Sequence, residues 1–157
     1  MSSVLFVCLG NICRSPTAHG VFARQVQAAG LEDSVRIDSA GTGAWHVGEP
    51  PDSRATASAL ARGYDLSPLR ARQVTPADFD HFDYILAMDR SNLSNLQVLR
   101  PDRYRGHLGL LLDFHPGPPV REVPDPYYGG TDGFEEVLDL VEAAGEALLA
   151  ELRRGRQ

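Results

Sequence analysis

The sequence predicts an α/β protein in which a parallel sheet is covered by helices on both faces. Strand-like apolar runs alternate along the chain with segments of helical spacing, which is typical of parallel α/β folds. The runs Val4–Val7 and Tyr84–Met88 are continuously apolar instead of alternating, as expected for strands buried on both faces. Among the 157 residues, neither a shift of composition nor an internal repeat divides the chain, so we expect one domain over residues 1–157.

The first half of the chain predicts two strands and two helices in alternation. After the strand Val4–Val7, Pro16 stands where the first residue of a helix is expected, with Ser15 as its N-cap. Gly30 ends this helix. The next expected elements are a strand over residues 35–39 and a helix over residues 53–62.

The second half predicts two further strands and two helices. The expected elements are a strand over 84–88, a helix over 91–99, a Leu-rich strand over 107–114, a proline-rich loop over 116–133 and a last helix from near Gly133. Cys8, Ser39 and Asp89 stand at the carboxyl ends of predicted strands. Ligands of open parallel sheets gather at these ends, so we expect the functional site there.

Charge and composition exclude several classes of function. The net charge is −6 and no basic run is present, so we expect no nucleic-acid partner. The chain contains no Lys, which excludes Schiff-base chemistry and the lysine-containing phosphate loop of ATPases. No apolar run approaches the roughly 18 residues of a membrane span, and residues 1–15 do not resemble a secretory signal. We therefore expect a cytoplasmic protein without a membrane partner. The two cysteines and five scattered histidines predict neither a disulfide scaffold nor a metal site.

The segment between the first strand and the first helix predicts an anion-binding loop. Gly10 and Asn11 tolerate the positive φ that turns successive backbone N–H groups inward. The helix N-terminus behind the loop adds partial positive charge. We expect a phosphate or another oxyanion to bind here. The loop reads Cys8-Leu9-Gly10-Asn11-Ile12-Cys13-Arg14-Ser15.

Cys8 stands where the strand enters this loop, beside the predicted cluster of N–H donors. Comparable sites lower the pKa of a cysteine from about 8.5 to about 3.5–7.5, which favours a thiolate nucleophile under a bound phosphate. Arg14 has the forked geometry that binds two phosphate oxygens at once. The Ser15 hydroxyl is a candidate donor to the thiolate as well as a candidate helix cap. A buried structural cysteine in an ordinary turn is the alternative interpretation.

Asp125 is the candidate general acid and base. It lies in Pro124-Asp125-Pro126-Tyr127-Tyr128, where the following proline disfavours helix and the preceding one stiffens the segment. Expulsion of an alkoxide or phenoxide needs a proton donor, and the later hydrolysis needs a base. A proline-rich surface turn without catalytic role is the alternative at this position.

These motifs resemble those of the low-molecular-weight protein tyrosine phosphatases over nearly the whole chain. The matching segments are residues 4–16, Asp38-Ser39, Ala71-Arg72-Gln73, residues 82–86, Met88-Asp89 and Asp125-Pro126-Tyr127. The resemblance implies a flavodoxin-like three-layer sandwich around four parallel strands. It also implies hydrolysis of phosphotyrosine through a cysteinyl-phosphate, with Cys8 as nucleophile, Arg14 as phosphate clamp and Asp125 as acid and then base. It implies no metal or organic cofactor, and a tyrosine-phosphorylated protein or peptide as substrate.

The resemblance assigns further residues to support of the loop and to the pocket. It implies that Asn11 and Ser39 bond to each other and brace the loop. The residues that it implies for the pocket wall and rim are Leu9, Ile12, Trp45, Tyr127 and Tyr128. One departure is Leu69, which stands where eukaryotic members have a His bonded towards the loop serine, so Ser15 is expected to be braced less. His19 replaces a common Glu and is interpreted as a surface residue, while His46 is either a rim residue or a solvated loop residue.

Three functions other than phosphotyrosine hydrolysis can be weighed from the sequence. An arsenate reductase on the same scaffold needs relay cysteines in a later segment, and the chain has none after Cys13. Protein-arginine phosphatases resemble the chain but carry Thr in place of Ile12, so we expect preference for phosphotyrosine. An inactive phosphotyrosine-binding module would not need Asp125. We further hypothesise that Cys8 and Cys13 pair under oxidant, and we expect a monomer or weak dimer.

Overall fold

The computed structural model describes residues 2–117, 121–127 and 131–154 and contains a four-stranded parallel sheet. The strands are β1 (Ser2–Cys8), β2 (Val35–Gly41), β3 (Tyr84–Ala87) and β4 (His107–Leu110), in the order β2-β1-β3-β4. The α-helices are α1 (Arg14–Ala28), α2 (Ser53–Ala61), α3 (Arg90–Leu99) and α4 (Thr131–Arg154). Two short 3₁₀ segments, η1 (Pro76–Asp80) and η2 (Leu111–Phe114), complete the described elements.

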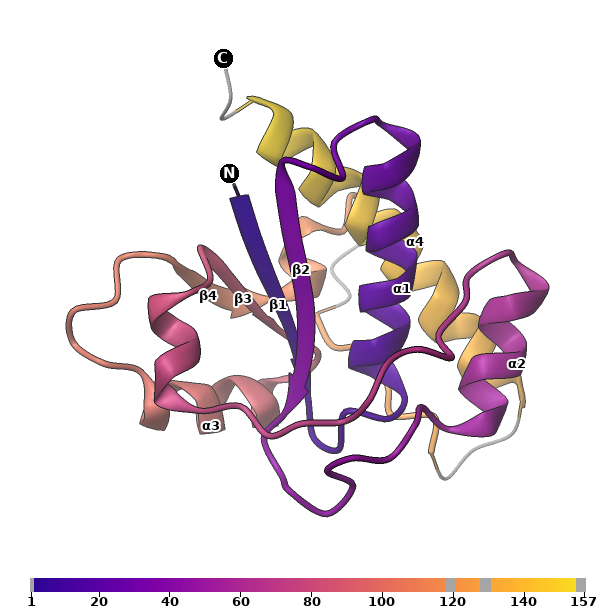
Figure 1. Cartoon of the computed structure of the whole chain (residues 1–157), viewed down its shortest axis with the longest axis horizontal. Coiled ribbons are helices and arrows are strands. Elements are labelled where there is room, and N and C mark those ends of the chain that lie inside the picture. Colours follow the sequence, from indigo (N-terminus) through magenta and orange to yellow (C-terminus); the bar gives the residue numbers. More distant parts are fainter. Residues whose placement is uncertain (1, 118–120, 128–130, 155–157) are drawn as a thin grey trace.

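Helices cover both faces of the sheet, which confirms the predicted fold class. Figure 1 shows α1 and α4 on one face of the sheet and α3 on the other. Val4, Phe6 and Cys8 belong to the apolar core under α1 and α4, whereas Leu5 and Val7 belong to the core on the α3 side. Because successive strand residues point to opposite faces, β1 supplies both cores and is buried over nearly its whole length.

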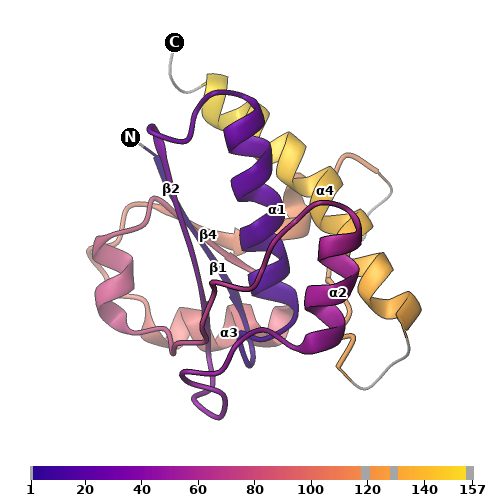
Figure 2. The ribbon, with the colours of Figure 1, turned by 45° about the vertical axis from the view of Figure 1, so that its right-hand side comes forward.

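Helix α2 lies outside these two layers of helices. Figure 2 shows it beside α1 and α4, away from the sheet. Asp52 caps its N-terminus, since the carboxylate accepts from the backbone N–H groups of Arg54 (2.8 Å) and Ala55 (3.3 Å). Arg62, directly after the helix, pairs with Glu135 (2.8 Å) and Glu142 (2.7 Å) of α4.

The predicted N-cap of the first helix is wrong. Helix α1 begins at Arg14, its N-cap residue is Cys13, and no side chain caps it. The Ser15 hydroxyl, which was expected to cap the helix, lies 3.0 Å from the sulfur of Cys8 instead. This hydroxyl also accepts from the side chain of Asn11, so its bonds go to the loop and not to the start of the helix.

The predicted fourth strand is only half strand. β4 ends at Leu110, and η2 follows from Leu111. The side chains of Leu111 and Leu112 both enter the core under α4, although a continuing strand would send consecutive side chains to opposite faces. A tight 3₁₀ turn allows both leucines to be buried on one side.

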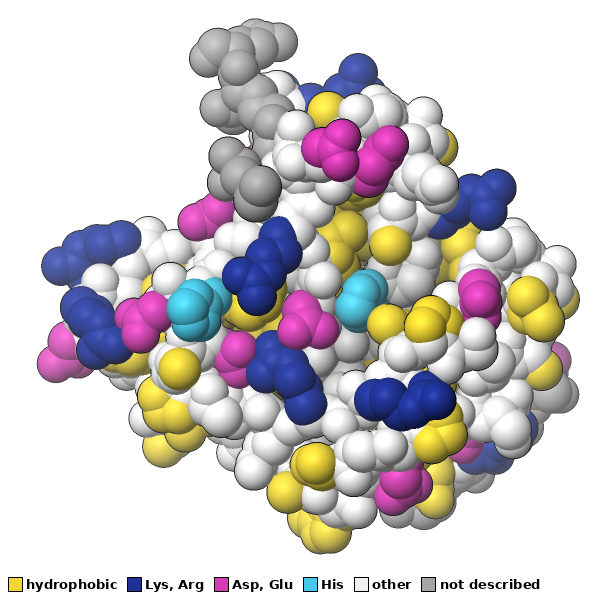
Figure 3. Space-filling view, viewed as in Figure 1, with side chains coloured by type: hydrophobic (Ala, Val, Ile, Leu, Met, Phe, Trp, Pro, Cys, Tyr) yellow, Lys and Arg dark blue, Asp and Glu magenta, His cyan; other side chains and the backbone are white. Residues whose placement is uncertain are grey.

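Charged side chains of both signs are mixed over the surface. Figure 3 shows Arg side chains next to Asp and Glu side chains on the face that carries β2. Ion pairs among the described residues include Arg103 with Asp80 (2.9 Å) and Arg72 with Asp38 (3.1 Å). Within the described ranges, no helix has the length and apolar character that crossing a bilayer requires.

Candidate active site

The loop between β1 and α1 is held open by hydrogen bonds from distant parts of the chain. Asn11 adopts a positive φ of 57° in this loop. Its side chain accepts from the backbone N–H of Arg72 (3.0 Å) and donates to the Ser15 hydroxyl (2.8 Å). These bonds hold a conformation that a non-glycine residue rarely adopts.

The end of β2 packs directly on this loop. The N–H of Thr42 donates to the carbonyl of Cys8, and the N–H of Gly43 donates to the carbonyl of Leu9, both at 2.9 Å. A Cβ on Gly41 would lie 2.7 Å from the Leu9 carbonyl oxygen, so this position accepts only glycine without a shift of the loop.

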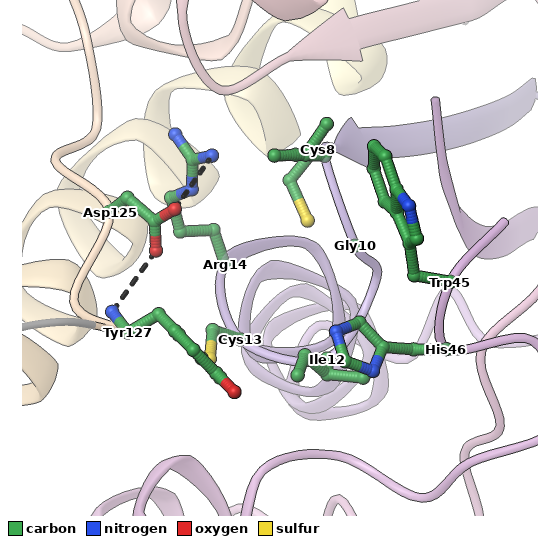
Figure 4. Close-up of a pocket in the computed structure, with 10 residues that line it drawn as sticks. Cys8, Gly10, Ile12, Cys13, Arg14, Trp45, His46, Asp125 and Tyr127 are labelled. Atoms are coloured by element: carbon green, nitrogen blue, oxygen red, sulfur yellow. Dashed lines mark hydrogen bonds and ion pairs between the residues drawn. The ribbon is translucent and has the colours of Figure 1, made fainter. Parts of the chain in front are cut away.

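Cys8 is 3% exposed and lies at the carboxyl end of β1. Its sulfur receives the backbone N–H of Asn11 at 3.3 Å and lies 3.0 Å from the Ser15 hydroxyl. Both groups are suited to stabilise negative charge on sulfur. The sulfur points into a pocket (Figure 4). The volume of this pocket is about 310 Å³.

Arg14 lies at the first turn of α1 and is 3% exposed. Its Nη1 donates to Asp89 (2.7 Å) and to the carbonyl of Val123 (3.1 Å). Burial acts against its charge, but the interactions with Cys8, Asp89 and Asp125 outweigh burial and raise the pKa of Arg14. The guanidinium therefore stays charged, and its orientation is fixed by groups from two other segments.

Asp125 lies beside Arg14 on one side of the pocket (Figure 4). One carboxylate oxygen lies 3.7 Å from Nη2 of Arg14, and the other accepts from the backbone N–H of Tyr127 at 3.1 Å. The structure thus brings Cys8, Arg14 and Asp125 together around one cavity, although Asp125 lies 117 positions after Cys8 in the sequence.

The mouth of the pocket is apolar and aromatic. Trp45 is 72% exposed, Leu9 42% and Tyr127 38%. Opposite Asp125, Trp45 and His46 form the other side of the cavity (Figure 4). The lining residues are Cys8, Leu9, Gly10, Ile12, Cys13, Arg14, Trp45, His46, Asp125 and Tyr127. Tyr128, which was also expected at the rim, lies outside the described residues.

The two loop cysteines have different surroundings. Cys13 is buried, and burial together with the nearby Asp52 carboxylate raises the pKa of its thiol to about 12. At neutral pH this thiol is therefore protonated. Neither cysteine forms a disulfide in the structure.

The expected hydrogen bond between Asn11 and Ser39 is absent from the described structure. The Asn11 side chain instead bonds the backbone N–H of Arg72 and the hydroxyl of Ser15. The Ser39 hydroxyl lies 3.2 Å from a ring nitrogen of His19. The interpretation of His19 as a surface residue is also wrong, because the ring is half-buried and burial lowers its pKa. Leu69, the departure from the family His, packs against the apolar core.

His46 lines the pocket and is partly exposed in a loop, so its position agrees with the rim interpretation. Its Nδ1 lies 3.2 Å from a carboxylate oxygen of Glu49, and its ring centroid lies 6.5 Å from that of Tyr127.

Three supporting residues received no role from the sequence. Asp89 was placed at a strand end but not paired with Arg14, and the backbone of Arg72 gave no local sign of its bond to Asn11. Arg54 donates to the carbonyl of Tyr127 at 3.0 Å. The only local signal for Arg54 was its position two residues after an Asp at a helix start.

Within the described ranges, no cluster of three or more His, Cys, Asp or Glu side chains has the arrangement of a metal site.

Known proteins resemble this chain over its full length. A family model described as "Low molecular weight phosphotyrosine protein phosphatase" matches residues 3–157. The low molecular weight protein-tyrosine-phosphatase YfkJ of Bacillus subtilis is 43% identical, over 100% of this chain and 99% of that protein. A crystal structure of a protein tyrosine phosphatase from Entamoeba histolytica has a TM-score of 0.95 and 41% identity and covers 100% of both chains. The structure of a Drosophila arginine phosphatase has a TM-score of 0.90 at 31% identity and covers 97% of this chain and 98% of that one.

Proposed function

The chain belongs to the low molecular weight phosphotyrosine protein phosphatase family and is a protein-tyrosine phosphatase, and we propose that it acts through a cysteinyl-phosphate on Cys8. The observation that supports this proposal best is the position of the Cys8 sulfur. It lies at a pocket lined also by Arg14 and Asp125, with an N–H and a hydroxyl directed at it.

In the first step the Cys8 thiolate attacks phosphorus, and the bond from phosphorus to the phenolic oxygen breaks. The Asp125 carboxyl gives its proton to the leaving oxygen, so the products are a cysteinyl-phosphate and a neutral tyrosine. Nη1 of Arg14 is held by Asp89 and Val123. The remaining edge of the guanidinium then faces the phosphoryl oxygens and follows them into the transition state.

In the second step the Asp125 carboxylate takes a proton from water, and the water oxygen attacks phosphorus. The bond from sulfur to phosphorus breaks, releasing phosphate and the thiolate. A donor relay supports the leaving sulfur: the Arg72 N–H bonds Asn11, whose amide donates to the Ser15 hydroxyl, which lies 3.0 Å from Cys8. Neither step requires a metal ion or an organic cofactor.

Substitution of the two reacting groups tests this proposal. With p-nitrophenyl phosphate and a phosphotyrosine peptide, in the absence of added metal, we expect Cys8→Ser to abolish turnover. We expect Asp125→Asn to lower kcat/KM for phenyl phosphate by about 100-fold, since a general acid contributes about that much. Wild-type activity in Cys8→Ser would refute the nucleophile. Arg103→Met, which breaks an exposed ion pair outside the pocket lining, is the matched control.

We propose phosphotyrosine rather than phosphoarginine as the preferred substrate. Ile12 lines the pocket and belongs to a small apolar cluster with Cys13, Ala55, Ala71 and Phe134, so we expect its methyl groups to form a fixed wall. This wall suits a flat phenyl ring better than a bulky phosphoguanidinium group. We expect the ratio of the two kcat/KM values to favour phosphotyrosine peptides and to shift towards phosphoarginine in Ile12→Thr. A higher value on phosphoarginine peptides in the wild type would contradict the preference.

The whole of residues 1–157 forms the phosphatase domain in this proposal, with tyrosine-phosphorylated proteins of the cytoplasm as substrates. A monomer or weak dimer is expected, and sedimentation across a concentration series measures it. A Cys8→Ser variant that keeps the oxyanion loop is a suitable trap for retrieving the physiological substrate from lysate.

A further inference from the structure

Arg54, in the first turn of α2, joins this helix to the segment that carries Asp125. Its Nη2 donates to the backbone carbonyl of Tyr127 at 3.0 Å. Its guanidinium also lies over two aromatic rings, 5.6 Å from the centroid of Tyr127 and 5.0 Å from that of Phe134. One side chain thus contacts both the acid segment and the start of α4.

The Arg54 guanidinium is itself held in place by Asp52, which is bonded to the loop between β1 and α1. The guanidinium binds the Asp52 carboxylate in a bidentate pair. Its Nε lies 3.2 Å from one carboxylate oxygen and its Nη2 lies 3.0 Å from the other. The backbone N–H of Asp52 donates to the carbonyl of Ile12 at 2.8 Å. A continuous series of bonds therefore runs from the phosphate loop through Asp52 and Arg54 to Tyr127.

The segment around Asp125 is anchored on both sides of the carboxylate. Two residues before it, Val123 donates its N–H to Met88 (2.8 Å) and receives Nη1 of Arg14 on its carbonyl (3.1 Å). Two residues after it, the carbonyl of Tyr127 receives Arg54, and the N–H of Tyr127 donates to the Asp125 carboxylate (3.1 Å). Removal of Arg54 would break the bond to the Tyr127 carbonyl and leave the bonds of Val123 intact.

We propose that Arg54 is a positioning residue that holds Tyr127, and through it the Asp125 carboxyl, where it can protonate the leaving group. The inference rests on the proposed role of Asp125 as general acid. Cys8 and Arg14 do not depend on this anchor, so attack on phosphorus and phosphate binding continue without it. Displacement of the acid should therefore slow most strongly those substrates whose leaving group depends most on protonation.

Comparison of two substrates with different leaving groups distinguishes this positioning role from a merely structural one. We expect Arg54→Met, which keeps much of the apolar stem, to lower kcat/KM for phenyl phosphate about tenfold and for p-nitrophenyl phosphate less than about twofold, since small displacements of a reacting group are costly. Arg54→Lys keeps the charge without the fork, so its loss should lie between wild type and Arg54→Met. Arg103→Met removes a similarly forked pair with Asp80 outside the pocket lining and should change neither value.

A second substitution tests whether Arg54 acts through Asp125. In an Asp125→Asn background, Arg54→Met should cause no further loss that is selective for phenyl phosphate. An equal loss on both substrates, or an undiminished selective loss in the Asp125→Asn background, would overturn the inference. If Asp125→Asn alone lost nothing on phenyl phosphate, the proposed function would fail first. If Arg54→Met does not fold, the ratio of the two substrates in Arg54→Lys decides the question.

Discussion

At the scale of single residues, the two cysteines of one loop are chemically different. The Cys8 sulfur faces the pocket, receives the N–H of Asn11 and lies 3.0 Å from the Ser15 hydroxyl, while burial raises the pKa of the Cys13 thiol to about 12 and keeps it protonated. We expect iodoacetamide at pH 7 to alkylate Cys8 and to spare Cys13, with inorganic phosphate protecting Cys8. Tandem mass spectrometry of the labelled peptide measures this. Labelling of Cys13 at a comparable rate would contradict the assignment.

The proximity of these cysteines in the chain leads to a redox prediction. Peroxide can take two electrons from the two thiols, leaving a disulfide and water, which protects Cys8 from irreversible oxidation. We expect a thiol reductant to restore activity after peroxide treatment of the wild type and to restore much less in Cys13→Ser. Equal recovery, or equal failure to recover, would argue against pairing.

At the scale of elements, Asp52 combines a helix cap with an ion pair. Burial alone would raise the pKa of this carboxyl. Hydrogen bonds from the side chain and backbone of Arg54 and from the N–H of Ala55 outweigh burial and lower the pKa. We expect Asp52→Ala to lower the free energy of unfolding by about 1 kcal/mol, a usual value for loss of a cap. Asp52→Asn keeps an oxygen for the cap but loses the charge and the second acceptor of the Arg54 pair.

The lowered pKa of Asp52 gives this charge a pH-dependent contribution. A carboxyl whose pKa is lower in the folded than in the unfolded protein stabilises above its unfolded pKa of about 3.9 and stops doing so as pH falls through its folded pKa. The stability difference between wild type and Asp52→Asn should therefore be present at pH 6 and shrink below about pH 4. Urea unfolding across this range measures it, and a difference that stays constant with pH would contradict the prediction.

Local patterns predicted the elements better than their ends. Continuous apolar runs indicated β1 and β3 correctly because burial on both faces leaves a sequence signature. The end of β4 was missed because the turn at Leu111 arises from burial against α4, which is distant in sequence. The prediction of Ser15 as a helix cap was wrong because its hydroxyl is engaged by Cys8 and Asn11 instead.

The candidate site shows the same limit. The anion-binding loop is one continuous segment, so residues 8–16 alone predicted its residues and the chemistry proposed for it. The supports of that loop are not local: the Arg72 N–H reaches Asn11 across 61 positions, and Asp89 pairs with Arg14 across 75. Sequence spacing carries no information on such contacts until the fold has brought the segments together.

At the scale of the whole molecule, one sheet carries both apolar cores. Leu148 on α4 lies in one core and Leu96 on α3 in the other, both fully buried. Because β1 contributes to both, we expect Leu148→Ala and Leu96→Ala each to lower the free energy of unfolding by about 2–5 kcal/mol within a single transition. Chemical unfolding followed by circular dichroism and fluorescence measures this.

The control for that experiment is Val98→Ala, since this α3 side chain is 85% exposed. Its effect should stay within about 0.5 kcal/mol. Two separate transitions, with each core variant shifting only one of them, would contradict a single domain over residues 1–157.

The most direct test of the account is to locate the transferred phosphoryl group. Asp125→Asn mixed with p-nitrophenyl phosphate should release nitrophenolate readily and hydrolyse the intermediate slowly, because the base of the second step is missing. Rapid acid quenching followed by mass spectrometry is expected to find the phosphoryl group on Cys8. Phosphoryl transfer to another residue, or turnover without any covalent adduct, would contradict the central claim.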